Sequence, residues 1–149
     1  MGEKLSFIRF PLVLVFIFFA GRLALGAAGV SYETANRVFS MVILQVHVAL
    51  IWAAVGRRYR GYTIGESILA VVMIVAFSQL LILIGTAGSY LTGADTLFNY
   101  PEALNSETPL EFQPAMMARV GGLVVNCIIG SIVAALGWAL GGLIPERTV

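Results

Sequence analysis

The sequence predicts an all-α membrane protein built as a bundle of four transmembrane helices. Of its 149 residues, 59% are hydrophobic and only 11% are charged, with a mean hydropathy of +0.93. Charged residues make up about 25% of a typical soluble domain, so this class is excluded. Four apolar runs are each long enough to cross a bilayer. The second run ends in a basic cluster, Arg57, Arg58 and Arg60, which is typical of a helix that stops on the cytoplasmic side.

The first predicted helix covers about residues 10–30 and contains one charged residue, Arg22. A secretory signal peptide is the alternative interpretation of this run, because a basic start, an apolar core and small residues follow one another. The position of Arg22 before the small residues, and the length of the apolar stretch, favour a helix that is retained.

Three further helices are predicted, at about residues 38–55, 64–87 and 120–144. A short polar turn, residues 31–37, precedes the second helix. We therefore expect residues 1–149 to form a single integral membrane domain.

The distribution of lysine and arginine predicts the orientation, because basic residues accumulate in cytoplasmic loops. One predicted side holds Lys4, Arg9, Arg57, Arg58, Arg60 and Arg147, whereas the other holds only Arg37 and Arg119. Both termini should therefore be cytoplasmic. The short loops favour a bacterial inner membrane as the location of this multi-pass protein.

A weak internal similarity suggests a duplicated helical hairpin. The second and fourth helices both begin at an Arg-Val pair, Arg37-Val38 and Arg119-Val120, and contain the related stretches ALIWAAVG and ALGWALGG. Internal repeats are common in membrane folds. Chance similarity between two apolar sequences is the alternative explanation.

Polar side chains inside the predicted helices are the candidate ligand-binding residues, because such groups are costly in hydrocarbon and tend to be functional. They are Arg22, Gln45, His47, Gln79 and Asn126, and all are expected in the outer half of the membrane. If they face one another, they form a polar pocket under the acidic loop. Gln45 and His47 are two positions apart, about 200° around a helix, so they cannot both point at one spot.

Each of these residues also has a purely structural interpretation. Arg22 can extend towards the outer interface if the first helix begins nearer Leu5. Gln79 and Asn126 can join helices by hydrogen bonds, and His47 can be a hydrogen-bonded packing residue, since a lone histidine lacks a second ligand.

The fourth predicted helix carries a stripe of small residues at steps of three and four. The stripe consists of Cys127, Gly130, Ala134, Gly137 and Gly141, and it includes a GxxxG motif. Small residues allow two helix backbones to approach closely, so this face is predicted to pack against another helix. The partner helix can belong to the same chain or to another subunit.

The longest predicted loop, residues 88–119, is acidic and holds three of the five prolines. Loops of this length are usually functional or carry structure of their own. The loop also contains the aromatic residues Tyr90, Phe98, Tyr100 and Phe112, which suit a surface against the membrane interface or a partner. We expect either an extracytoplasmic docking element or lid, or a short helix that only covers the bundle.

No catalytic, metal or nucleotide motif stands out, and the net charge of +1 gives no reason to expect nucleic-acid binding. The leading hypothesis is a non-enzymatic membrane protein that acts by association, as an accessory or scaffold subunit or as a homo-oligomer. The alternative is binding of a lipid, quinone or tetrapyrrole in the outer pocket. Arg22 would then pair with an anionic or carbonyl group, and His47 would donate a hydrogen bond or serve as an axial ligand to a tetrapyrrole. A dimeric small-molecule transporter is the weaker alternative. The sequence names no cofactor.

Overall fold

The computed structural model describes residues 2–145, which form α-helices and one short 3-10 helix, with no strand among them. The elements are α1 (Gly2–Ala27), α2 (Tyr32–Val38), α3 (Met41–Arg60), α4 (Ile64–Thr92), η1 (Pro101–Leu104) and α5 (Phe112–Gly141). Four helical stretches are long and apolar enough to cross a membrane, with α2 and α3 together forming the second. The predicted all-helical membrane bundle is therefore confirmed. Arg147, used above for the orientation, lies outside the described residues.

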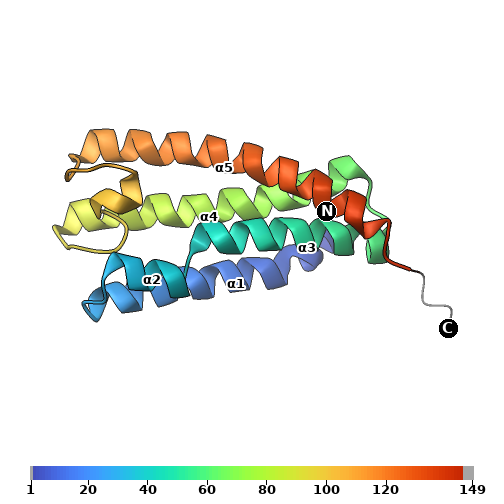
Figure 1. The fold of residues 1–149 in the computed structure, drawn as a ribbon, viewed down its shortest axis with the longest axis horizontal. Coiled ribbons are helices and arrows are strands. Elements are labelled where there is room, and N and C mark those ends of the chain that lie inside the picture. Colours follow the sequence, from blue (N-terminus) through green and yellow to red (C-terminus); the bar gives the residue numbers. More distant parts are fainter. Residues whose placement is uncertain (1, 146–149) are drawn as a thin grey trace.

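The helices run side by side along one long axis (Figure 1). One end of the bundle, which we call the terminal end, is where α1 begins, α3 turns into α4 and α5 ends. The opposite end, called the loop end, holds the α1–α2 turn and the segment between α4 and α5. Helices α3 and α4 contribute to the packing of both α1 and α5. The side of the membrane that each end faces, and the duplication, stay predictions.

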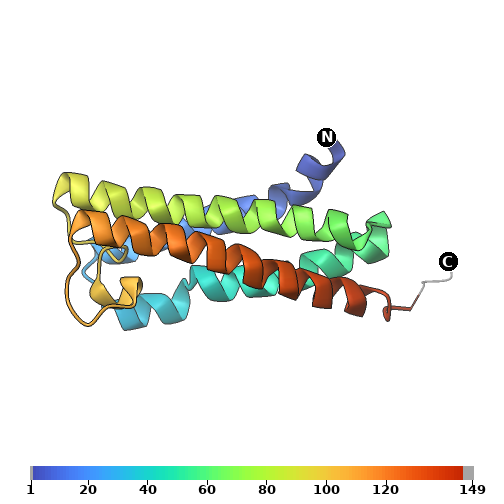
Figure 2. The same ribbon diagram turned by 90° about the horizontal axis from the view of Figure 1, so that it is seen from above.

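Helix α1 begins earlier than the predicted residue 10 and contains Pro11 in its interior. Proline has no backbone N–H, so the carbonyl four residues earlier, that of Phe7, loses its partner within the helix. The indole Nε1 of Trp52 on α3 donates to this carbonyl at 2.9 Å. In Figure 2 the first turns of α1 lean away from the bundle, in keeping with the bend that an interior proline causes.

The predicted polar turn at residues 31–37 is wrong, because this stretch forms α2. The hydroxyl of Ser31 caps the helix by accepting from the Thr34 N–H at 3.4 Å, and Glu33 pairs with Arg37 one turn later. Such caps and i,i+4 pairs stabilise even a short polar helix. The C-cap of α2 is Phe39, which separates this helix from α3. The Phe39 ring packs so closely on Gly21 that a Cβ at this glycine would lie only 2.8 Å from the ring.

The segment between α4 and α5 is shorter than predicted. Helix α4 continues past residue 87 to Thr92 and ends at Gly93 in the left-handed conformation, with φ +67°. Helix α5 begins at Phe112, with Pro114 in its first turn. Proline is tolerated there because the first N–H groups of a helix have no partner within it. The loop is therefore 93–111 instead of 88–119.

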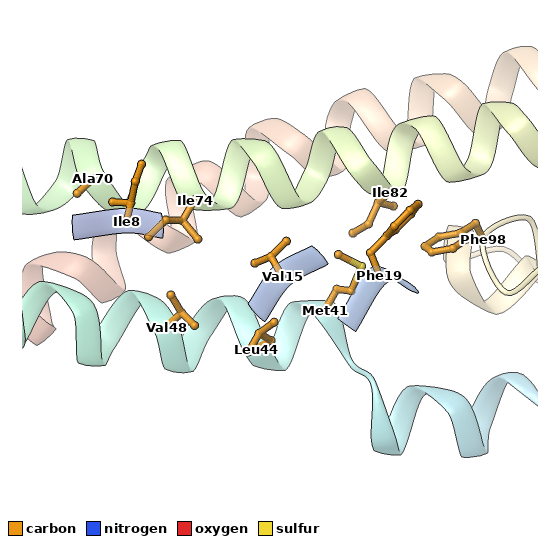
Figure 3. Packing of buried hydrophobic residues seen from close by; sticks show 10 residues of the cluster. All are labelled: Ile8, Val15, Phe19, Met41, Leu44, Val48, Ala70, Ile74, Ile82 and Phe98. Carbon is orange, nitrogen blue, oxygen red and sulfur yellow. The ribbon is translucent and has the colours of Figure 1, made fainter. Parts of the chain in front are cut away.

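Two apolar clusters hold the helices together. The first joins α1, α3, α4 and the loop (Figure 3) and contains Ile8, Val15, Phe19, Met41, Leu44, Val48, Ala70, Ile74, Ile82 and Phe98. The second joins α3, α4 and α5 through Ala49, Ala53, Val71, Val75 and Ala134. Small residues dominate the second cluster, so α3 and α5 can approach closely.

The small-residue stripe of α5 faces the interior of the bundle. Gly130, Ala134, Gly137 and Gly141 are all buried. A Cβ on Gly137 would lie 2.2 Å from the carbonyl oxygen of Leu50, and one on Gly141 would lie 2.6 Å from that of Ala54. Gly137 and Gly141 are thus covered by α3 of the same chain, whereas Gly130 is covered by Val71 and Val75 of α4.

Candidate ligand-binding site

Arg22 lies inside the bundle near the loop end. Its side chain is only 6% exposed. One terminal nitrogen, Nη1, donates to Oδ1 of Asn36 on α2 at 3.0 Å, and the other, Nη2, donates to the carbonyl of Leu97 in the loop at 3.4 Å. The remaining nitrogen, Nε, is buried with no hydrogen-bond partner among the described residues. This buried cation therefore keeps an N–H donor that no described residue uses.

Aromatic rings surround the same guanidinium group. Its central carbon lies 5.0 Å from the centre of the Tyr32 ring and 5.6 Å from that of Phe98. Contacts with aromatic faces at this range stabilise a cation by about 0.5–2 kcal/mol. They supply partial compensation but no negative charge.

Arg119 is a second arginine at this end, and its predicted place in the loop is wrong. It lies in the third turn of α5 and extends towards the loop. Its Nε donates to Oγ1 of Thr86 at 2.8 Å, Nη1 to the carbonyl of Ala103 at 2.8 Å and Nη2 to that of Phe98 at 2.6 Å. The signal that could have found it is Pro114, since a proline in a first turn places Arg119 inside the helix.

Two adjoining cavities lie beside these arginines. The smaller, of about 80 Å³, is lined by both Arg22 and Arg119. The larger, of about 390 Å³, is lined by Arg119 and extends along α4 and α5. They share Tyr32, Val42, Ile82, Ala103 and Arg119 as lining residues, so we treat them as one space and call it the arginine pocket. The larger part has the size of a small-molecule site, about 300–1,000 Å³.

The arginine pocket has no carboxylate paired with either arginine. Among the described residues, neither Arg22 nor Arg119 forms an ion pair. The nearest acidic residue in the lining is Glu102, which lines the larger cavity and is exposed at its rim. The pocket thus holds two positive charges, one on the buried Arg22 and one on the half-buried Arg119.

Three of the predicted polar residues line this pocket. Gln79 and Asn126 line the larger cavity and Arg22 lines the smaller one. Gln45 lies behind them, donating to Oγ of Ser78 at 2.6 Å and accepting from Nε2 of Gln79 at 3.1 Å. This buried network joins α3 to α4, in agreement with the structural interpretation of Gln79. Asn126 instead donates to the Gly122 carbonyl of its own helix at 2.7 Å.

His47 does not join this set. Its ring is exposed on the outside of the bundle, where Nδ1 lies 2.8 Å from the carbonyl of Ile43. Gln45, two positions earlier, is buried. The two side chains therefore point to opposite sides of α3, and the arrangement offers no axial ligand to a group bound in the pocket. Within residues 2–145 no three His, Cys, Asp or Glu side chains gather at one place.

The loop folds into the bundle. Leu97 and Phe98 are each 1% exposed, and Phe98 belongs to the first apolar cluster. The hydroxyl of Tyr90 donates to the carbonyl of Leu110 at 2.6 Å. The expectation of an aromatic docking surface is therefore wrong for Phe98, which forms part of the core beside the arginine pocket.

No protein-family model, curated protein or solved structure matches this chain. Its four apolar spans make it a multi-pass membrane protein. Any more specific function has to be argued from the geometry of the arginine pocket.

Proposed function

We propose that this protein binds an anionic ligand whose negatively charged group lies between Arg22 and Arg119. The observation that carries the proposal is the pairing of two arginines in one pocket with no carboxylate partner among the described residues. Buried charges in proteins are normally paired, because an uncompensated ion loses several kcal/mol of solvation. A bound anion would supply the missing charge.

A structural role explains only part of the arrangement. The three hydrogen bonds of Arg119 tie the loop to α5 and α4, and those of Arg22 tie α1 to α2 and the loop. This role requires neither the unpartnered Nε of Arg22 nor a cavity between the two side chains. Both are expected of a site that receives a ligand.

Arginine is suited to this task because its planar guanidinium presents five donors in a fixed geometry that matches phosphate and carboxylate oxygens. The cavity of about 80 Å³ between the arginines exceeds the roughly 10–15 Å³ that one water molecule requires. A carboxylate or phosphate group is therefore the chemistry that the pocket favours. A carbonyl group, as in a quinone, would leave the two positive charges uncompensated.

The test is native mass spectrometry of the protein extracted from its own membrane in a mild non-ionic detergent. We expect an added small mass on the 16.0 kDa chain. The added mass should disappear in Arg22→Gln, which removes one cation from the pocket. Arg37→Gln is the matched control, since Arg37 lies at the same end but is exposed and pairs with Glu33.

Retention of the added mass in Arg37→Gln and its loss in Arg22→Gln would support the proposal. A wild-type protein without any added mass, or one whose added mass does not depend on Arg22, would overturn it. Arg22→Lys separates charge from geometry, and we expect partial retention because lysine keeps the charge but loses the fork of donors.

The association hypothesis stays a prediction. Its argument from the small-residue stripe is weakened, because α3 of the same chain covers Gly137 and Gly141. The same spectrum tests it, since an accessory or scaffold subunit would carry other polypeptides and a homo-oligomer would appear at a multiple of 16.0 kDa. Flux into liposomes would test the transporter alternative.

A further inference from the structure

We infer that the anionic ligand is a glycerophospholipid that reaches the arginine pocket sideways from the bilayer, through the space between α3 and α5. This inference rests on the proposed function and adds the source of the ligand and its route. Its phosphate would lie at Arg22 and Arg119, and its acyl chains would leave the protein between the two helices.

The first argument is the way in which α3 and α5 separate. At the terminal end they are in close contact, because Gly137 and Gly141 allow the backbone of α3 to approach, and Arg57 donates to the carbonyl of Trp138 at 3.0 Å. Nearer the loop end, Val42 of α3 and Val125 of α5 line a cavity instead. Figure 1 shows the two helices diverging in this direction.

The second argument is that apolar, exposed side chains of α3 and α5 stand at the edge of the cavity. Val42 is 50% exposed and Val125 is 53% exposed, and each lines the cavity while lying on the outside of an apolar span. In a membrane such surfaces face the hydrocarbon. The opening between α3 and α5 is thus lined by apolar side chains, which suit acyl chains better than a water-soluble ion.

The third argument is that the loop covers the pocket at its end. Ala103 and Leu104 of η1 line the larger cavity, and Arg119 fixes the loop through the carbonyls of Phe98 and Ala103. Glu102 adds a negative charge at this rim. A free anion approaching from water at this end would have to pass the loop and its carboxylate, whereas a lipid entering between the helices would not pass the loop first.

Polar groups deeper in the cavity fit the middle of such a lipid. Asn126 lies seven residues after Arg119 on α5, about 10 Å along the axis and on the same face. Gln79 lies seven residues before Thr86 on α4, and Thr86 is the residue whose hydroxyl accepts from Arg119. Both amides line the cavity. Each amide nitrogen uses one N–H within the protein, and its second N–H can donate to the ester carbonyls of a glycerophospholipid.

Two neighbouring glycines allow a sharp test. A Cβ on Gly121 or on Gly122 would have no heavy atom within 4 Å, so a larger side chain fits at either position. Only Gly122 lines the cavity. Gly122→Leu should therefore fill the route of the lipid, whereas Gly121→Leu makes the same chemical change outside it.

The experiment is native mass spectrometry of the protein in dodecyl maltoside micelles supplied with phosphatidylglycerol, with inorganic phosphate in a parallel sample. We expect phosphatidylglycerol bound to the wild type and to Gly121→Leu. We expect about 10- to 100-fold less in Arg22→Gln, since hydrogen bonds to charged groups are lost, and a similar loss in Gly122→Leu. Inorganic phosphate alone should give no comparable adduct.

The outcomes separate this inference from the proposed function. Binding that depends on Arg22 but is unchanged in Gly122→Leu, or that occurs with inorganic phosphate as well as with the lipid, would leave an anion site and overturn the sideways route. Binding that depends on neither residue would overturn both. Near-identical helicity and thermal unfolding of the two leucine variants is the control for folding.

Discussion

Replacement of Gly137 by alanine should destabilise the bundle more than any other glycine-to-alanine change in the middle of α5. The added Cβ would lie 2.2 Å from the Leu50 carbonyl oxygen, whereas ordinary contact begins near 3.4 Å. The helices would have to separate by about 1.2 Å, the difference between these distances. The neighbouring atoms belong to backbone, which cannot rotate away, so we place the cost at the upper end of overpacking penalties, about 3 kcal/mol.

Two other glycines of the same helix make this prediction quantitative. Alanine at Gly121 meets open space and should stabilise the protein by about 0.5–1 kcal/mol through helix propensity alone. Alanine at Gly130 would lie 3.0 Å from Cγ2 of Val75, a side chain that can shift, so an intermediate cost is expected. The same substitution should thus change sign along one helix.

The assay is reversible unfolding of the protein in mixed micelles by increasing amounts of dodecyl sulfate, with helicity followed by circular dichroism. The free energy of unfolding should fall in the order Gly121→Ala, wild type, Gly130→Ala, Gly137→Ala. Equal stability of Gly121→Ala and Gly137→Ala would refute the close approach of α3 and α5, and with it the divergence that forms the opening of the arginine pocket.

Three further predictions use the same protein. Trp52→Phe should lower the free energy of unfolding by about 0.6 kcal/mol, the mean value for hydrogen bonds between helices in membranes. The loss should be smaller in a Pro11→Ala background, because the new N–H at position 11 can then donate to the Phe7 carbonyl. Equal losses in the two backgrounds would contradict the proline explanation. Gln45→Leu and Gln79→Leu should be non-additive in a double-mutant cycle, because either change alone removes the hydrogen bond between the two amides. Strictly additive losses would exclude this interaction. Arg119→Gln should speed amide hydrogen exchange in the loop between α4 and α5 by about tenfold or more, because the bonds from Arg119 to two loop carbonyls are lost. The α3–α4 turn is the internal control. An unchanged exchange rate in the loop would show that these bonds do not hold the loop in place.

The helical spans were predictable because length and apolar composition decide them, but their ends were less so. Prolines and acidic residues between α4 and α5 indicated a loop up to residue 119. Pro114 instead occupies the first turn of α5, where its missing N–H costs nothing. Misplacing that helix start also removed Arg119 from the candidate site.

The polar residues of the site were identifiable one by one, but their contacts were not. Gln45 and His47 are equally polar in the sequence, and only the rotation of α3 decides that Gln45 faces Gln79 while His47 faces outwards. The rotation depends on packing with α1 and α4, which no local pattern records. Similarly, the turn of direction at Phe39, which brings Asn36 to Arg22, depends on the fit of a ring against Gly21.

The composition of the arginine pocket bears on how the protein is made. Its walls come from α1, α2, α3, α4, η1 and α5, and its two arginines stand near the beginning and near the end of the chain. A chain is synthesised from its N-terminus, so Arg22 is in place long before Arg119. The pocket is therefore completed only when α5 has been inserted, and a bound ligand would mark a chain in which all the helices that form the pocket are in place.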